Sequence, residues 1–337
     1  MKNSLKLVFA IIASLYILNG CSKDNSNSTT GIIDTNLIKI EHALNHSNID
    51  FVNLVNKTRG SVGTNGPGSK VVWSRKNNYN LGLFVSANHV YGISTWQTLN
   101  EKFIDIATVN NGVFIGSKMP TINGSVNFTN ELTASFGLYH PTIPSDATNT
   151  TILPENDFYL GIIDNQRIID NGFGNYPTLV QTSTPLQLFD PNNRTLSVQT
   201  WAIPNDNNIV IAVGYPQDTD SYPNGAVSTG KVYSDAEAVN IIQSLNLIND
   251  VEGDISYNPQ VEFLANIEVV SGMSGGGVFN EDGQLLGVMV RATTFNGQPI
   301  LRVVRMSYIV HTLTSFYNAL SISNKNKLQP FISGELN

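Results

Sequence analysis

Beyond Gly60 the chain is a succession of short runs of β-branched and aromatic residues, each ended after a few positions by Asn, Gly or Pro. Many short strands at close spacing predict an antiparallel sandwich or barrel. Charged residues make up only 13% of the chain, about half the usual share, which leaves few positions for long surface helices. The runs that we assign to strands are 70–74, 81–86, 112–115, 209–213, 227–233, 287–291 and 299–305.

Two stretches show the periodicity of helices instead. Residues 33–57 carry apolar positions close to helical spacing that are interrupted near residues 45–48, so we expect one or two short helices leading into the folded body. Near the end, apolar side chains recur from Tyr308 to Leu320. This spacing predicts a terminal helix that packs one face on the body.

The first residues read as a targeting signal. Two lysines precede an uncharged apolar stretch, Leu7 to Leu18, which is too short to span a bilayer. Its end, Leu-Asn-Gly-Cys at 18–21, resembles the lipobox of bacterial lipoproteins. The resemblance implies a signal peptide over 1–20, lipid attachment at Cys21, and a tether with a short helical lead-in over 21–60.

The expected location follows from that signal. Ser-Lys-Asp after Cys21 resembles the surface-export signals of Bacteroidetes lipoproteins. We therefore expect a cell-envelope protein, anchored by its lipid to a membrane, the outer membrane of a Gram-negative bacterium. A surface position is the first expectation, and a periplasm-facing position is the alternative.

Composition excludes several classes of function. Cys21 is the only cysteine, so a disulfide, a cysteine nucleophile and a cysteine metal site are all excluded. The chain has 19 Lys and Arg against 26 Asp and Glu, a net charge of −7. This acidic balance argues against nucleic acid as a partner.

The most informative motif is Val-Ser-Gly-Met-Ser-Gly-Gly-Gly-Val-Phe at 270–279. A serine among glycines lets the backbone turn tightly, expose a hydroxyl and aim N–H groups at one point. The motif, with the strand, turn and strand pattern after it, resembles the Gly-x-Ser-Gly-Gly signature of the chymotrypsin/trypsin-like serine proteases. The resemblance implies that Ser274 is the nucleophile and that the N–H groups of Gly272 and Ser274 form an oxyanion hole.

A serine hydroxyl needs a base that accepts its proton. His89 follows an apolar run that ends in Ser-Ala-Asn, which is similar to the strand ending Thr-Ala-Ala-His of trypsin-like enzymes. We therefore expect His89 to be the base. The remaining histidines, for which we expect packing or surface roles, are His42, His46, His140 and His311.

The base in turn needs a carboxylate that fixes its tautomer. Asn-Asp-Phe-Tyr-Leu-Gly at 156–161 resembles the Asn-Asp-Ile-Ala-Leu-Leu segment of the family, so Asp157 is the expected third member. Asp105, in Ile-Asp-Ile-Ala, stays open as the rival. It follows His89 so closely that little room is left for the intervening strands.

The order His, Asp, Ser along the chain is that of chymotrypsin and differs from the orders in subtilisins and α/β-hydrolases. A Gly-Tyr-Pro strand end at 214–216 and a Ser-x-Gly-x-Val strand at 228–232 are also similar to bacterial members of the family. The resemblance implies an all-β fold of two six-stranded antiparallel β-barrels of the chymotrypsin type with a C-terminal helix. The protease domain would occupy 61–325, with the boundary between barrels at about 170–195.

The implied function is that of a serine endopeptidase. It would act as a monomer on a protein or peptide substrate through an acyl-enzyme, with no metal and no cofactor. In the family the residue six positions before the nucleophile often lies at the base of the primary pocket. Glu268 holds that position, with Val290 and Arg291 in one wall. There it would favour Lys or Arg substrates, and the alternative is that Glu268 is a solvated residue at a strand edge.

Two other functions stay open. A catalytically inactive trypsin-like lipoprotein could act as a surface binding protein, and the same triad could serve a lipid or carbohydrate esterase. Covalent labelling by a fluorophosphonate separates the binder from the enzymes.

Overall fold

The computed structural model describes residues 36–64, 68–76, 81–91, 105–109, 112–116, 135–139, 141, 152–164 and 201–322. The expected signal peptide, Cys21, His140 and the expected barrel boundary at 170–195 lie outside these residues. Within the described ranges, no helix combines the length and the apolar character that a bilayer crossing requires.

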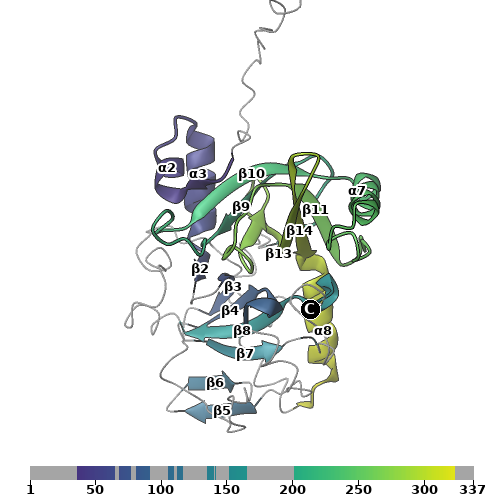
Figure 1. Ribbon diagram of the computed structural model, residues 1–337. Coiled ribbons are helices and arrows are strands. Elements are labelled where there is room, and N and C mark those ends of the chain that lie inside the picture. The colour runs from purple at the N-terminus through teal and green to yellow at the C-terminus, as the bar shows by residue number, and fades with distance from the viewer. Residues whose placement is uncertain are drawn as a thin grey trace, which may run out of the picture. The chain divides into compact units, whose positions relative to one another are not determined.

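Six antiparallel strands of the C-terminal half close into a barrel (Figure 1). β9 pairs with β10 on one side and with β12 on the other, where Val213 lies opposite Gly277, so the ring has no open edge. The predicted six-stranded barrel is confirmed for this half. Its strands in spatial order are β9 (Ile209–Gly214), β10 (Ala226–Val232), β11 (Glu262–Asn266), β14 (Gln298–Arg305), β13 (Leu285–Phe295) and β12 (Gly277–Phe279).

Alternation of side chains explains why β9 is buried on both faces. Successive strand residues point to opposite sides of a sheet. Val210 and Ala212 belong to one core cluster, and Ile211 and Val213 belong to another. The cluster with Val210 also contains Met273, which directly precedes the candidate nucleophile. The nucleophile loop is thus fixed to the core by its own apolar residue.

The N-terminal half forms a five-stranded antiparallel sheet and a separate hairpin. Pairings among the described residues leave β2 and β7 as the edges of the sheet, so a second closed barrel stays a prediction. The sheet order is β2 (Val62–Thr64), β3 (Ser69–Lys76), β4 (Leu81–Ser86), β8 (Tyr159–Asp164) and β7 (Ser135–Tyr139), and the hairpin consists of β5 (Asp105–Val109) and β6 (Gly112–Gly116).

The lead-in contains a short strand and two helices. β1 (Ile38–Lys39) pairs with the start of β10, with Ile38 opposite Val227, whereas β11 pairs with the end of β10. α2 (Ile40–Leu44) and α3 (Ile49–Arg59) follow. α3 begins where the Asn48 side chain accepts two backbone N–H groups of the first turn, which is the usual role of an N-cap.

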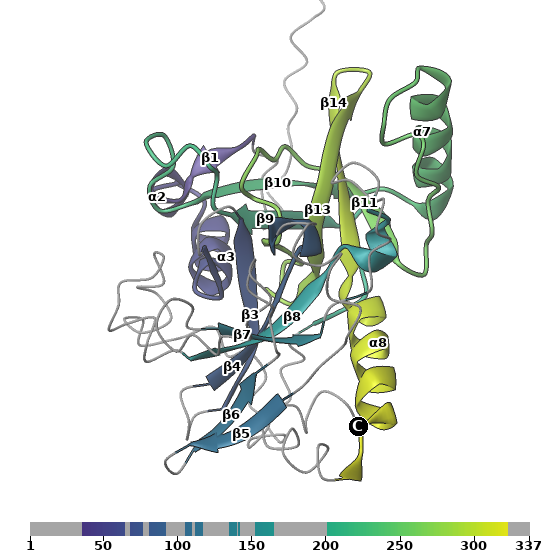
Figure 2. The same ribbon diagram turned by 60° about the horizontal axis from the view of Figure 1, so that its bottom comes forward.

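Two further helices belong to the C-terminal half. α7 (Asp235–Leu247) was not predicted, although it has a capping box formed by Ser234 and Glu237. α8 (Met306–Ala319) is the predicted terminal helix. It lies beside the N-terminal sheet in both ribbon views (Figures 1 and 2), where the Phe316 ring is 5.1 Å from that of Tyr139.

Candidate active site

Strand pairing brings His89 and Asp157 together. Ser86 at the end of β4 lies opposite Tyr159 at the start of β8, so the residues just beyond these strand ends are neighbours. His89 Nδ1 lies 2.9 and 3.0 Å from the two carboxylate oxygens of Asp157, and the His89 backbone N–H donates to Oδ1 at 3.0 Å. Because an ionised carboxylate only accepts hydrogen bonds, the neutral ring carries its proton on Nδ1 and leaves Nε2 free to accept one.

The side chain of Asn88 links the residue before His89 to the residue before Asp157. Its side-chain Nδ2 donates to the backbone carbonyl of Asn156 at 2.9 Å. Asp157 is fully buried, whereas the side chain of His89 keeps 20% exposure. The carboxylate is therefore shielded from water, and the imidazole reaches the surface.

The environment of His89 moves its pKa upward. Burial is the largest single influence and lowers the pKa, but the charge and the hydrogen bond of Asp157 together outweigh it. The positive charge of Arg291 works against them. The net effect places the pKa of His89 above its usual value of 6.5, which makes the ring a stronger base.

Two N–H groups in the nucleophile loop, those of Gly272 and Ser274, have no acceptor among the described residues. Met273 N–H donates to Val270 O at 3.1 Å, and Gly275 N–H donates to Met289 O at 2.8 Å. The N–H groups of Gly272 and Ser274, which alternate with them, make no hydrogen bond to any residue in the described part of the chain. These are the two donors that the sequence assigned to an oxyanion hole.

The peptide plane of each free N–H is fixed by a hydrogen bond to the carbonyl oxygen of the same peptide. Ser271 O accepts the N–H of Gln217 at 2.8 Å, and Met273 O accepts the N–H of Gly276 at 2.9 Å. A trans peptide directs its carbonyl and its N–H in opposite directions, and the described chain has no cis peptide. The hydrogen bonds to Ser271 O and Met273 O fix the direction of these two carbonyls. The N–H groups of Gly272 and Ser274, on the same peptides, therefore point in the opposite directions.

Ser69 on β3 holds the other two carbonyls of the loop. Its hydroxyl donates to Gly272 O at 3.0 Å, and its backbone N–H donates to Ser274 O at 2.8 Å. Gly272 has a φ of +94°, a region that glycine enters without steric cost. The loop is thus an ordered turn with both free donors on a fixed backbone.

Two glycine contacts join the nucleophile loop to the segment of His89. A Cβ on Gly275 would lie 3.0 Å from the backbone N of Ala87. A Cβ on Gly68 would lie 2.5 Å from a methyl group of the residue after His89 and 3.0 Å from the carbonyl oxygen of Ser274. The described side chains include no hydrogen bond between the His89 ring and Ser274.

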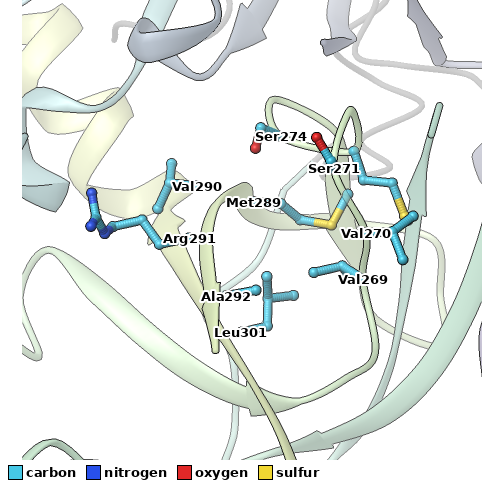
Figure 3. A pocket seen from close by; sticks show the side chains of 10 residues that line it. Val269, Val270, Ser271, Ser274, Met289, Val290, Arg291, Ala292 and Leu301 are labelled. Carbon is cyan, nitrogen blue, oxygen red and sulfur yellow. The ribbon is translucent and has the colours of Figure 1, made fainter. Parts of the chain in front are cut away.

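Ser274 lines a pocket of about 270 Å³ (Figure 3). Val290 and Arg291 line it, and seven of the ten lining residues have apolar side chains. The guanidinium of Arg291 points away from the cavity in Figure 3. The lining residues are Val269, Val270, Ser271, Met273, Ser274, Met289, Val290, Arg291, Ala292 and Leu301.

The expected position of Glu268 at the base of this pocket is wrong. Ile267 turns into the core, so the next side chain along the extended chain turns outward. Glu268 is exposed, and its carboxylate accepts the backbone N–H of Leu37 at 3.2 Å. Arg291 already has a carboxylate partner, because its Nε lies 2.8 and 3.0 Å from the two oxygens of Glu252.

The other predicted residues lie apart from the site or outside the description. His42 and His311 are exposed, and His46 Nδ1 accepts the N–H of Asn48 in the turn before α3. Asp105 belongs to β5, which pairs with β6. Sequence reasoning missed Ser69 and Gln217 altogether, since both act through contacts with a loop far away in the sequence.

Comparisons with known proteins give a distant likeness. No family model and no curated protein sequence matches the chain. Similar solved structures include the HtrA-type protease AlgW with a decapeptide, at 14% identity and a TM-score of 0.35, covering 75% of this chain and 52% of that one. The Rv3671c protease of M. tuberculosis H37Rv in an inactive form has 12% identity, a TM-score of 0.38 and coverages of 80% and 96%.

A serine endoprotease from Yersinia pestis is similar at 14% identity and a TM-score of 0.39, covering 79% of this chain and 66% of that one. The chain spans about half the length of the HtrA-type protease. All three structures are named as proteases, and the one from Yersinia pestis as a serine endoprotease. At such low scores the likeness does not assign an activity, so that assignment depends on the geometry of the site.

Proposed function

We propose that this chain is a serine endopeptidase that cleaves peptide bonds through an acyl-enzyme on Ser274. The observation that carries the proposal is the hydrogen-bonded pair of His89 and Asp157 beside a loop in which two N–H donors have no partner among the described residues. A base with a fixed tautomer, a serine hydroxyl and a pair of free donors are the parts that acyl transfer requires.

Each residue then has one role in the reaction. Ser274 Oγ attacks the substrate carbonyl carbon while its proton passes to His89 Nε2, and the carbonyl electron pair moves to oxygen, where the N–H groups of Gly272 and Ser274 stabilise it. His89 returns the proton to the leaving amine as the C–N bond breaks. A water then repeats the attack with His89 as base and releases the acid. Asp157 accepts the Nδ1 hydrogen bond throughout and stabilises the imidazolium.

Labelling with a fluorophosphonate tests this mechanism. The wild-type protein is expected to form one covalent adduct, which peptide mass spectrometry assigns to Ser274. Labelling should disappear in His89→Ala, because the hydroxyl loses its base. The matched control is His311→Ala, since His311 is an exposed histidine on α8, and it should label like the wild type.

The same experiment separates the competing functions. A folded wild-type protein that takes up no label contradicts the enzyme and favours a binding protein. An enzyme that labels but cleaves a short acyl ester and leaves casein intact is an esterase. Both hydrolases would use the same triad, so only the paired substrates distinguish them.

The lining of the pocket predicts a preference for an apolar side chain on the acyl side of the cleaved bond. A Lys side chain would lose its hydration there without gaining a partner, because the described residues that line the pocket include no carboxylate. We expect kcat/KM for a Leu or Met anilide to exceed that for the matched Lys anilide by about 10- to 100-fold. Glu268→Gln should leave this ratio unchanged. A preference for Lys that Glu268→Gln removes would restore the original expectation.

The proposal extends to the fold and to the anchor. We propose that the five-stranded sheet and the β5–β6 hairpin, whose strand β6 contacts β7, belong to a second barrel. We also propose that lipid on Cys21 holds the protein at the outer membrane, as the sequence at 18–21 suggests. The substrate is then a protein or peptide of the cell envelope or its surroundings.

A further inference from the structure

Ser69, the first residue of β3, is the point where three segments of the candidate site meet. It is fully buried. Its hydroxyl accepts the N–H of Tyr215 at 2.8 Å and donates to the carbonyl of Gly272 at 3.0 Å. Its backbone N–H donates to Ser274 O at 2.8 Å, and its carbonyl accepts the hydroxyl of Ser86 at 2.6 Å.

The backbone bonds of Ser69 and its hydroxyl bonds have different requirements. Any residue at this position can supply the backbone N–H and carbonyl. The link from Tyr215 through Oγ to Gly272 needs a group that donates one hydrogen bond and accepts another. A hydroxyl does both well, a thiol does both weakly and a methyl group does neither. Its removal would leave a buried N–H and a buried carbonyl without their partner.

The backbone conformation of Gly272 needs contacts from other segments to fix it, more than that of a residue with a side chain. With φ at +94° and no side chain, its flanking peptides are restricted little by local sterics. Ser271 O, on the preceding peptide, is held by Gln217 N–H at 2.8 Å. The carbonyl on the following peptide is held by the hydroxyl of Ser69. The Gly272 N–H is on the first of these peptides and is directed by the contact with Gln217. The contact with Ser69 holds the second peptide, which links the free N–H of Gly272 to that of Ser274.

We propose that the Ser69 hydroxyl is a positioning group for the oxyanion hole. It holds the Gly272–Met273 peptide, which links the two free N–H groups, in the orientation that lets both groups face the developing oxyanion. It does so from the sheet that also carries His89. The proposal rests on the function proposed above. Ser69 touches no substrate, so it acts on turnover only through the nucleophile loop.

The test compares Ser69→Ala with Ser69→Thr. Loss of an oxyanion donor costs about 10²–10³ in turnover, and a donor that is displaced rather than removed should cost part of this. We expect Ser69→Ala to lower kcat on the best peptide substrate by about 10- to 100-fold with KM changed less than about 3-fold. Ser69→Thr, which restores the hydroxyl, should recover most of kcat.

A matched deletion separates positioning from stability. Ser61 is also fully buried, and its hydroxyl donates to the carbonyl of Thr58 at 2.9 Å, remote from the nucleophile loop in sequence. Ser61→Ala should lower the melting temperature without lowering kcat per folded molecule. In Ser69→Ala the acid limb of the pH–kcat profile should stay where it is, because the pair of His89 and Asp157 is intact.

The outcomes distinguish this inference from the proposed function. A wild-type protein that neither labels nor turns over contradicts the proposed function. If the wild type is active and Ser69→Ala keeps its kcat per folded molecule, the positioning role is wrong, and a loss that Ser69→Thr does not recover also overturns it. Should Ser69→Ala fail to fold, Ser69→Cys, with a similar size and a weak donor, replaces it in the same comparison.

Discussion

Asp157→Asn is expected to lower kcat about 10⁴-fold without unfolding the protein. The remaining oxygen can still accept the backbone N–H of His89, which lies 3.0 Å from Oδ1. The new amide nitrogen would donate to Nδ1, so the ring proton would move to Nε2. An imidazole protonated at Nε2 cannot take the proton of Ser274, and the first step of acyl transfer loses its base. Steady-state turnover of a Leu anilide measures the loss.

Asp105→Asn is the matched control for this experiment, because Asp105 is the rival that the sequence left open. It should turn over the substrate like the wild type. Circular dichroism and the melting temperature show whether each variant is folded. The assignment of Asp157 is contradicted if its variant is folded and active, and it passes to Asp105 if that variant loses turnover instead.

Local motifs made the chemical residues predictable from sequence. The glycines around Ser274 are needed for a turn with positive φ at Gly272 and Gly275, and such turns leave a visible pattern. The strand ends before His89 and around Asp157 are equally local. Each motif lies within a few residues, so it can be recognised without knowledge of strand pairing.

Contacts between distant segments were not predictable in the same way. Ser69 holds Gly272 across 203 positions of sequence, and nothing near Ser69 indicates that partner. The position of Glu268 was misjudged because the direction of a side chain depends on strand register, and a shift of one residue reverses it. α7 was not predicted, although Ala238, Ile242 and Leu245 form a buried helical face.

Lys70 offers a second large effect, this time on stability. It follows Ser69 on β3 and is 2% exposed, with Nζ 4.6 Å from the centre of the Phe84 ring. Among the described residues no carboxylate pairs with it. Burial lowers the pKa of Lys70 to about 7, whereas the unfolded chain keeps the usual value near 10.4. Between these values the unfolded state binds the extra proton, so the free energy of unfolding should rise with pH.

The change Lys70→Met keeps the length of the apolar stem and removes the titrating group. A pKa difference of this size corresponds to a penalty of about 4 kcal/mol at pH 7 and below, which fades as the pH approaches 10. We therefore expect Lys70→Met to be more stable than the wild type in urea unfolding at pH 7, with the advantage shrinking steadily through pH 8 and 9.

Lys231 provides the control for that experiment, because it is an exposed lysine on β10. Lys231→Met should change the unfolding midpoint little and by the same amount at every pH. If Lys70 instead stays protonated over the face of Phe84, a cation–π contact is lost on substitution, and Lys70→Met should be less stable than the wild type. A gain that does not vary with pH would also contradict the proton-linked account, because improved packing alone has no reason to follow a titration.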